Sequence, residues 1–145
     1  MSDVGEALGY AAAHEHLSDV VELARRLLVR HVATRSYRLT EAAGTLSDLY
    51  VSVVEAGRLL EGAAASAGRG PAGKWPDAQA AQLAVDAQRR VILTRLEGSD
   101  PGLRFPLEDL RAFFELDELA VDLVAVLMAV QDDVDVHRLA RFAQA

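Results

Sequence analysis

The stretch LAVDLVAVLMAV, residues 119–130, is apolar at every position except Asp122. A strand would need apolar and polar residues in alternation, or a second strand to pair with, and the sequence offers neither. The stretch is also shorter than the ~20 apolar residues needed to cross a bilayer. It therefore predicts a helix that is apolar on all sides, Leu119 to Val130, at the centre of an all-α fold with other helices around it.

Further helices are predicted on the N-terminal side of this stretch and after it. Apolar residues recur at helical spacing over residues 16–32, 46–60 and 76–97, and shorter helices begin near Pro106 and Val136. A weaker helix over residues 4–13 stays open, because glycines interrupt it. The pattern predicts a single helical bundle of about five to seven helices.

One break in composition divides the chain. Residues 62–76 are dense in Gly, Ala, Ser and Pro, which is typical of a flexible loop. We expect a single domain, residues 1–145, with two sub-halves, 1–65 and 76–145, joined by this loop. The last helix stops at Ala145 without a cap or a polar tail, so we expect the sequence to be a fragment of a longer chain.

Composition narrows the classes of function. The 145 residues include no cysteine, which excludes disulfides, thiolate metal sites and a cysteine nucleophile. Fifteen basic and twenty-two acidic residues give a net charge of -7, which disfavours nucleic acid as a partner. The N-terminus lacks the basic and apolar regions of a signal peptide, and no apolar run spans a membrane. We expect a cytoplasmic protein without a membrane partner.

A glycine-rich segment partly matches the sequence pattern of a nucleotide-binding loop. Residues 68–74, GRGPAGK, place Lys74 where a phosphate-binding lysine would lie. Trp75 stands where Ser or Thr should hold magnesium, and a predicted helix rather than a strand precedes the segment. A small nucleotide-binding enzyme that uses Lys74 is therefore the weaker interpretation, and no nucleophile with a neighbouring base points to another activity. The chain alone is predicted not to be an enzyme and to hold no cofactor.

Several acidic and histidine side chains are candidate metal ligands. Asp132, Asp133, Asp135 and His137 lie close together in sequence, but they lack the glycine and the bidentate glutamate of a calcium loop. Capping of the last helix is the favoured interpretation. Asp122, within the apolar stretch, is predicted to be buried and paired with an arginine. His14 and His16 fall on different helix faces, and His31 is predicted on an apolar face, so none forms a metal pair.

Residues 106–130 have the outline of a helix-turn-helix DNA reader. Its second helix would enter a major groove, which requires exposed basic or amide side chains. The stretch 119–130 has none of these. The arginines of the other helices are interpreted as solvated outer faces: Arg25, Arg26, Arg30, Arg89, Arg90 and Arg95. The sequence therefore predicts no DNA binding.

Two segments resemble a known family. The first is Leu49-Tyr50-Val51-Ser52 with Glu55, Leu59 and Leu60 downstream. The second runs from Leu107 to Phe142, with Leu110, Phe114, Leu116, Asp122, an acidic turn and Leu139 along it. Together, in this order, they resemble the N-terminal helical region of large bacterial AAA+ ATPases that contain a winged-helix domain. These ATPases are commonly encoded with contractile injection systems.

The resemblance implies an accessory role. The chain would be the helical domain that precedes the winged-helix and ATPase domains, so ATP and magnesium would bind beyond Ala145. Its partners would be injection-system subunits or its own ATPase domains, and no catalytic, cofactor or metal residue is assigned to it. Aromatic side chains dominate protein interfaces, so the predicted interaction surface consists of exposed Tyr37, Tyr50, Trp75 and Phe105.

Overall fold

The computed structural model describes residues 9–35 and 77–144. Within these ranges it contains helices and no strand, which confirms the all-α fold class. The helices are α1 (Ala13–Arg35), α4 (Ala78–Glu97), α5 (Pro106–Phe114), α6 (Glu118–Asp132) and α7 (Val134–Gln144). The helix predicted over 46–60, the loop 62–76 and the first segment of the family resemblance lie outside the described residues.

Local residues fix the starts of three helices. The side chain of Asp77 accepts a hydrogen bond from the Ala80 amide at 2.9 Å, and Asp117 accepts one from the Ala120 amide at 2.8 Å. These bonds satisfy amides that have no partner within their own helix. Pro106 occupies the first turn of α5, where its missing N–H costs nothing. The helices predicted over 76–97, from near Pro106 and over 119–130 are therefore confirmed, and they start at Ala78, Pro106 and Glu118.

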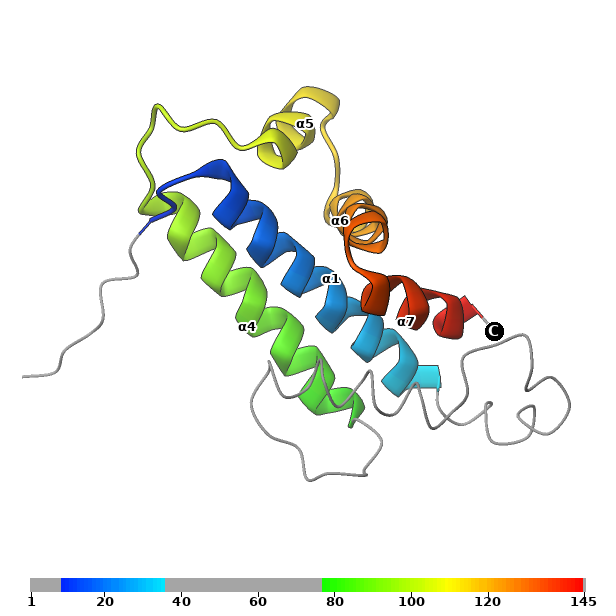
Figure 1. Ribbon diagram of the computed structural model, residues 1–145. Coiled ribbons are helices and arrows are strands. Elements are labelled where there is room, and N and C mark those ends of the chain that lie inside the picture. Colours follow the sequence, from blue (N-terminus) through cyan, green and yellow to red (C-terminus); the bar gives the residue numbers. More distant parts are fainter. Residues whose placement is uncertain (1–8, 36–76, 145) are drawn as a thin grey trace, which may run out of the picture.

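The centre of the bundle is α1. It runs antiparallel to α4, with α6 and α7 packed along its other side (Figure 1). Its buried side chains form the largest single share of the core, and every neighbouring helix adds to it: Val20, Leu23, Ala24, Leu27, Leu28 and Val32 of α1, Val85 and Ile92 of α4, Leu107 of α5, Ala125 and Ala129 of α6, and Val136 and Leu139 of α7. Helix α1 thus supplies the surface on which the other helices pack.

The predicted central position of residues 119–130 is therefore wrong. On α6 only Ala125 and Ala129 are completely buried, and its leucines point outward. The two alanines are four residues apart and lie on one face, where their small side chains allow α6 to lie against α1. An apolar composition alone predicted burial on all sides, but only the alanines are completely buried, the valines pack partly against the core, and the leucines are exposed.

Arginines join the helices across the bundle. Arg95 of α4 lies 2.8 Å from both Glu15 and Asp19 of α1, and Arg26 of α1 donates to the Ala84 carbonyl at 2.9 Å. Arg25 pairs with Asp133 at the start of α7. The prediction of solvated arginine faces is wrong for these residues, because each makes a polar contact with a different helix or its cap: Arg95 and Arg25 with carboxylates, and Arg26 with a backbone carbonyl.

The segment before α1 packs against the end of α4 and joins the two helices at that end of the bundle. Tyr10 donates its amide to Ser99 Oγ at 2.8 Å, just beyond the end of α4. A Cβ on Gly9 would lie 2.1 Å from the Gly98 carbonyl oxygen, so only glycine permits this approach of the two backbones. Among residues 9–35 and 77–144, no helix combines the length and apolarity required to cross a bilayer.

Candidate interaction surface

A short turn connects α5 to α6. Glu115 ends α5 in the left-handed conformation, at φ 51° and ψ 43°, and the Leu116 amide returns to the Arg111 carbonyl at 3.0 Å. Such a cap satisfies a carbonyl at the helix end but usually employs glycine. Asp117 then caps α6. The pair is a helix, a tight turn and a second helix, as the outline of the sequence predicted.

The exposed side of α6 carries a row of leucines. Leu119, Leu123 and Leu127 are 67, 57 and 66% exposed, and their spacing of four residues aligns them over about 12 Å of the helix. We call these three residues the leucine ridge. They lie on the opposite side of α6 from buried Ala125 and Ala129. Neighbouring exposed leucines of this kind are typical of a protein interaction surface rather than of a monomer surface.

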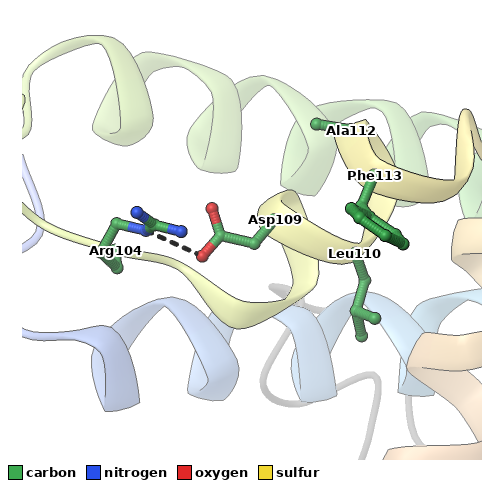
Figure 2. A pocket seen from close by; sticks show the side chains of 5 residues that line it. All are labelled: Arg104, Asp109, Leu110, Ala112 and Phe113. Carbon is green, nitrogen blue, oxygen red and sulfur yellow. Dashed lines mark hydrogen bonds and ion pairs between the residues drawn. The ribbon is translucent and has the colours of Figure 1, made fainter.

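Helix α5 adds two exposed aromatic rings. Phe113 and Phe114 are 80 and 60% exposed, and their rings meet edge to face with centroids 4.9 Å apart. We call these two residues the phenylalanine pair. Figure 2 shows Phe113 beside Leu110 at the edge of a shallow hollow of about 520 Å³. At its other end Arg104 donates to Asp109 at 3.0 Å. Exposed aromatic rings beside a hollow are typical anchors of protein interfaces.

Acidic residues flank the leucine ridge at both ends. Glu115, Asp117 and Glu118 precede it, and Asp132 follows it. Helix α6 contains no basic residue, although Arg89 of α4 contacts Glu118 and Asp122, both at 2.7 Å. Glu115, Asp117 and Asp132 form no ion pair with any of the residues the structure describes. The surface is therefore apolar along its middle and negatively charged at its ends.

A buried aromatic cluster holds the start of α5 against α1. Phe105, directly before α5, is only 8% exposed, and its ring centroid lies 5.6 Å from that of Tyr10 and 5.1 Å from that of His16. The prediction of an exposed Phe105 is wrong, because the ring belongs to the core. The Tyr10 hydroxyl donates to Asp19 at 2.9 Å, and the Arg95 guanidinium lies over the Tyr10 ring at 4.1 Å.

His16 is fully buried within this cluster. Burial lowers its pKa from the ordinary value, although Glu108 and Asp19 act in the opposite direction. Its Nε2 lies 3.7 Å from Glu108 Oε1, and neither ring nitrogen has a hydrogen-bond partner among the described residues. His14 and His31 are exposed, so the predicted apolar position of His31 is wrong. Because the folded state disfavours protonation of His16, we expect the stability of the contact between α1 and α5 to depend on pH.

Asp133, one of the acidic residues near α7, caps that helix. Asp133 Oδ1 accepts the amides of Asp135 and Val136 at 2.9 and 3.2 Å, which confirms the capping interpretation. Burial raises the pKa of Asp133, but hydrogen bonds from Arg25 and the two amides outweigh it, so the pKa falls below its ordinary value. Among the described residues, no group of three or more histidine and acidic side chains is placed to hold a metal ion.

The predicted partner of Asp122 is identified. Arg89 Nη2 donates to Asp122 Oδ2 at 2.7 Å, which confirms the prediction of an arginine-paired carboxylate. The other predicted surface aromatics, Tyr37, Tyr50 and Trp75, lie outside the described residues, as does Lys74 with its glycine-rich segment. The structure therefore neither joins these residues to the α5–α6 surface nor separates them from it.

Sequence analysis missed the leucine ridge. The pattern that reveals it is the separation of large from small side chains within 119–130: the leucines recur every four residues, and Ala125 and Ala129 lie on the opposite face. Leucine and alanine both count as apolar residues, so a pattern of apolar positions does not show which face of the helix carries the larger side chains. The phenylalanine pair is hidden for a similar reason, because apolar residues in a short amphipathic helix normally indicate its buried face.

Comparison with known proteins gives one family. The family described as "Winged helix domain, variant" matches residues 2–145. No curated protein and no solved structure matches the chain. The match covers this chain itself, whereas the resemblance placed the winged-helix domain after it.

Proposed function

Because the chain belongs to the family described as "Winged helix domain, variant", we propose that it is a non-catalytic binding domain whose partner is a protein. Winged helix domains typically bind protein or DNA and are not enzymes as a rule. The observation that carries the choice of protein is the leucine ridge on α6, with the phenylalanine pair before it. Burial of these side chains by a partner would stabilise a complex by roughly 25 cal/mol for each Å² of apolar surface.

The chemistry of α6 argues against DNA. In a helix-turn-helix reader, the second helix contacts base edges, mostly through Arg, Lys, Asn or Gln. Helix α6 presents leucines and carboxylates instead, and Gln131 near its end is its only amide side chain. Carboxylates at both ends of the ridge would face the phosphates of a duplex. The pair α5 and α6 therefore shares the order helix, turn, helix with a DNA reader, but its exposed side chains favour a protein partner.

The resemblance to AAA+ ATPases of contractile injection systems suggests in which larger protein this domain would act. We propose that it acts in the cytoplasm as an accessory, regulatory domain of such an ATPase and contacts either injection-system subunits or the ATPase domains. ATP and magnesium would then bind outside these residues. A freestanding helical binding protein is the alternative, and it would use the same surface.

Photo-crosslinking from the surface tests the proposed binding function. A photoreactive amino acid is placed at position 123, on the ridge, and as a matched control at position 90, where exposed Arg90 lies on α4. We expect a discrete protein adduct in the source cell from position 123 and none from position 90. The adduct should disappear when Leu119 and Leu127 are both replaced by Gln. An adduct with DNA, or equal adducts from both positions, would contradict the proposal.

The mass of the native gene product tests the proposed setting. An antibody raised against this chain should detect a protein several times its size in the source cell, since an AAA+ ATPase needs further domains. A product of about 15.6 kDa would overturn the ATPase setting and leave the freestanding binding protein. The crosslinking result does not depend on this outcome.

A further inference from the structure

The charges around the leucine ridge point to the chemistry of its partner. Residues 108–135 contain a single basic residue, Arg111, and many carboxylates: Glu108, Asp109, Glu115, Asp117, Glu118, Asp122, Asp132, Asp133 and Asp135. Asp122 and Asp133 have arginine partners on other helices, but Glu115, Asp117 and Asp132 have none among the described residues. The carboxylates that remain available for a partner therefore lie at the two ends of the ridge.

We propose that the leucine ridge binds an amphipathic helix that carries apolar side chains on one face and lysine or arginine beside them. This inference rests on the proposed protein-binding function and specifies the class of partner. The ridge has one leucine every four residues, which forms a row inclined to the helix axis, so a second helix can pack its own apolar row against it. Basic residues at the borders of that row would meet the carboxylates at the ends of α6.

The same charges disfavour a second copy of this chain on the ridge. Two copies would bring their acidic ends together, and the whole chain has a formal charge of -7. Like charges placed opposite each other weaken association, and salt screens that repulsion. A basic partner gives the reverse behaviour, because salt weakens attraction. The dependence of binding on salt therefore distinguishes the two occupants.

Three synthetic peptides of equal length provide the probe. The first forms a helix with leucines on one face and lysines elsewhere. The second has glutamate in place of every lysine, and the third keeps the composition of the first but distributes its leucines around the helix. Binding to the full chain is measured by fluorescence anisotropy at low and at physiological ionic strength. Sedimentation of the chain alone, at both salt concentrations, reports self-association.

We expect the lysine peptide to bind at least about tenfold more tightly than either control at low salt, and more weakly as salt increases. Leu123→Gln should weaken it about tenfold, since it removes one apolar anchor of the ridge. Glu115→Gln should weaken it about twofold, whereas Glu97→Gln, at an exposed position on α4, should leave it unchanged.

Every other outcome contradicts the inference, and each identifies a different alternative. Equal binding of the lysine and glutamate peptides, with both weakened by Leu123→Gln, would refute the basic partner and leave the proposed binding function intact. Equal binding of the peptide with distributed leucines would show adsorption by charge alone. A dimer that strengthens with salt and is lost in Leu123→Gln would identify a second copy as the occupant. If no peptide binds, the inference fails, and crosslinking from position 123 still decides the binding function.

Discussion

His16 shows how a single side chain makes stability depend on pH. The ring lies between Tyr10 and Phe105, completely buried, and its pKa is lowered chiefly by that burial. The unfolded chain therefore takes up a proton on His16 more readily than the folded chain does. Folding stability is complete above the ordinary pKa of 6.5 and decreases as the pH falls below it, until the lowered pKa of the folded state is passed.

Replacement of this ring by an apolar one should remove the effect. We expect His16→Phe to abolish the part of the pH dependence that begins near 6.5, because phenylalanine has no proton to bind. The free energy of unfolding, measured by urea titration between pH 5 and 8, checks this. His14→Phe, at an exposed position two residues away, is the control and should leave the pH dependence unchanged. An unchanged pH dependence in His16→Phe would assign the titration to another group.

Gly9 is a second residue whose identity the structure requires. A methyl group at this position would meet the Gly98 backbone, with Cβ 2.1 Å from the carbonyl oxygen. We expect Gly9→Ala to destabilise the fold by about 1–3 kcal/mol, because the two backbones must separate. Gly102→Ala is the control, since the nearest atom there is a side-chain oxygen of Asp100 at 3.2 Å. Equal losses of unfolding free energy in the two variants would contradict the close approach at Gly9.

Among the elements, α6 differs most from what the sequence predicted. Its limits were predicted to within two residues, since the predicted range was 119–130 and the helix spans Glu118–Asp132, with Asp117 as its N-cap. Its burial was not, because a helix with apolar residues on every side contains no polar face to indicate which side meets water. The smaller side chains face the bundle and the largest face solvent: Ala125 and Ala129 are buried, Val121, Val124, Val126 and Val130 pack partly against the core, and the three leucines are exposed. The α5–α6 surface therefore follows from packing between elements, which local sequence does not specify.

The close contact of α6 with α1 should be sensitive to size. We expect Ala125→Leu to destabilise the protein by about 1–3 kcal/mol, because Ala125 is completely buried and has no space for three more carbons. Ala80→Leu, at an exposed position of α4, should change the free energy of unfolding by less than about 0.5 kcal/mol. Thermal or urea unfolding of both variants makes the comparison. A well-tolerated Ala125→Leu would mean that α6 does not lie closely on α1.

For the whole molecule, sequence analysis identified the all-α class and most helix limits but not the arrangement of the helices. Caps and prolines act within a few residues, so they can be recognised locally. The pairs of Arg95 with Glu15 and Asp19 join residues that are about 80 positions apart, and no local pattern identifies them. The burial of Phe105 likewise depends on Tyr10 and His16. The family match then gave the type of domain, and the partner class that we propose rests on the exposed leucines.

The central claim is that the leucine ridge faces solvent in the isolated chain and is thus available to a partner. The most direct test is the free energy of unfolding of Leu127→Gln, compared with that of Leu28→Ala in the core. We predict a change below about 0.5 kcal/mol for Leu127→Gln, because Leu127 is two-thirds exposed, and a loss of about 2–5 kcal/mol for buried Leu28→Ala. A loss in Leu127→Gln as large as that in Leu28→Ala would contradict the account, since it would show that the chain itself covers the ridge.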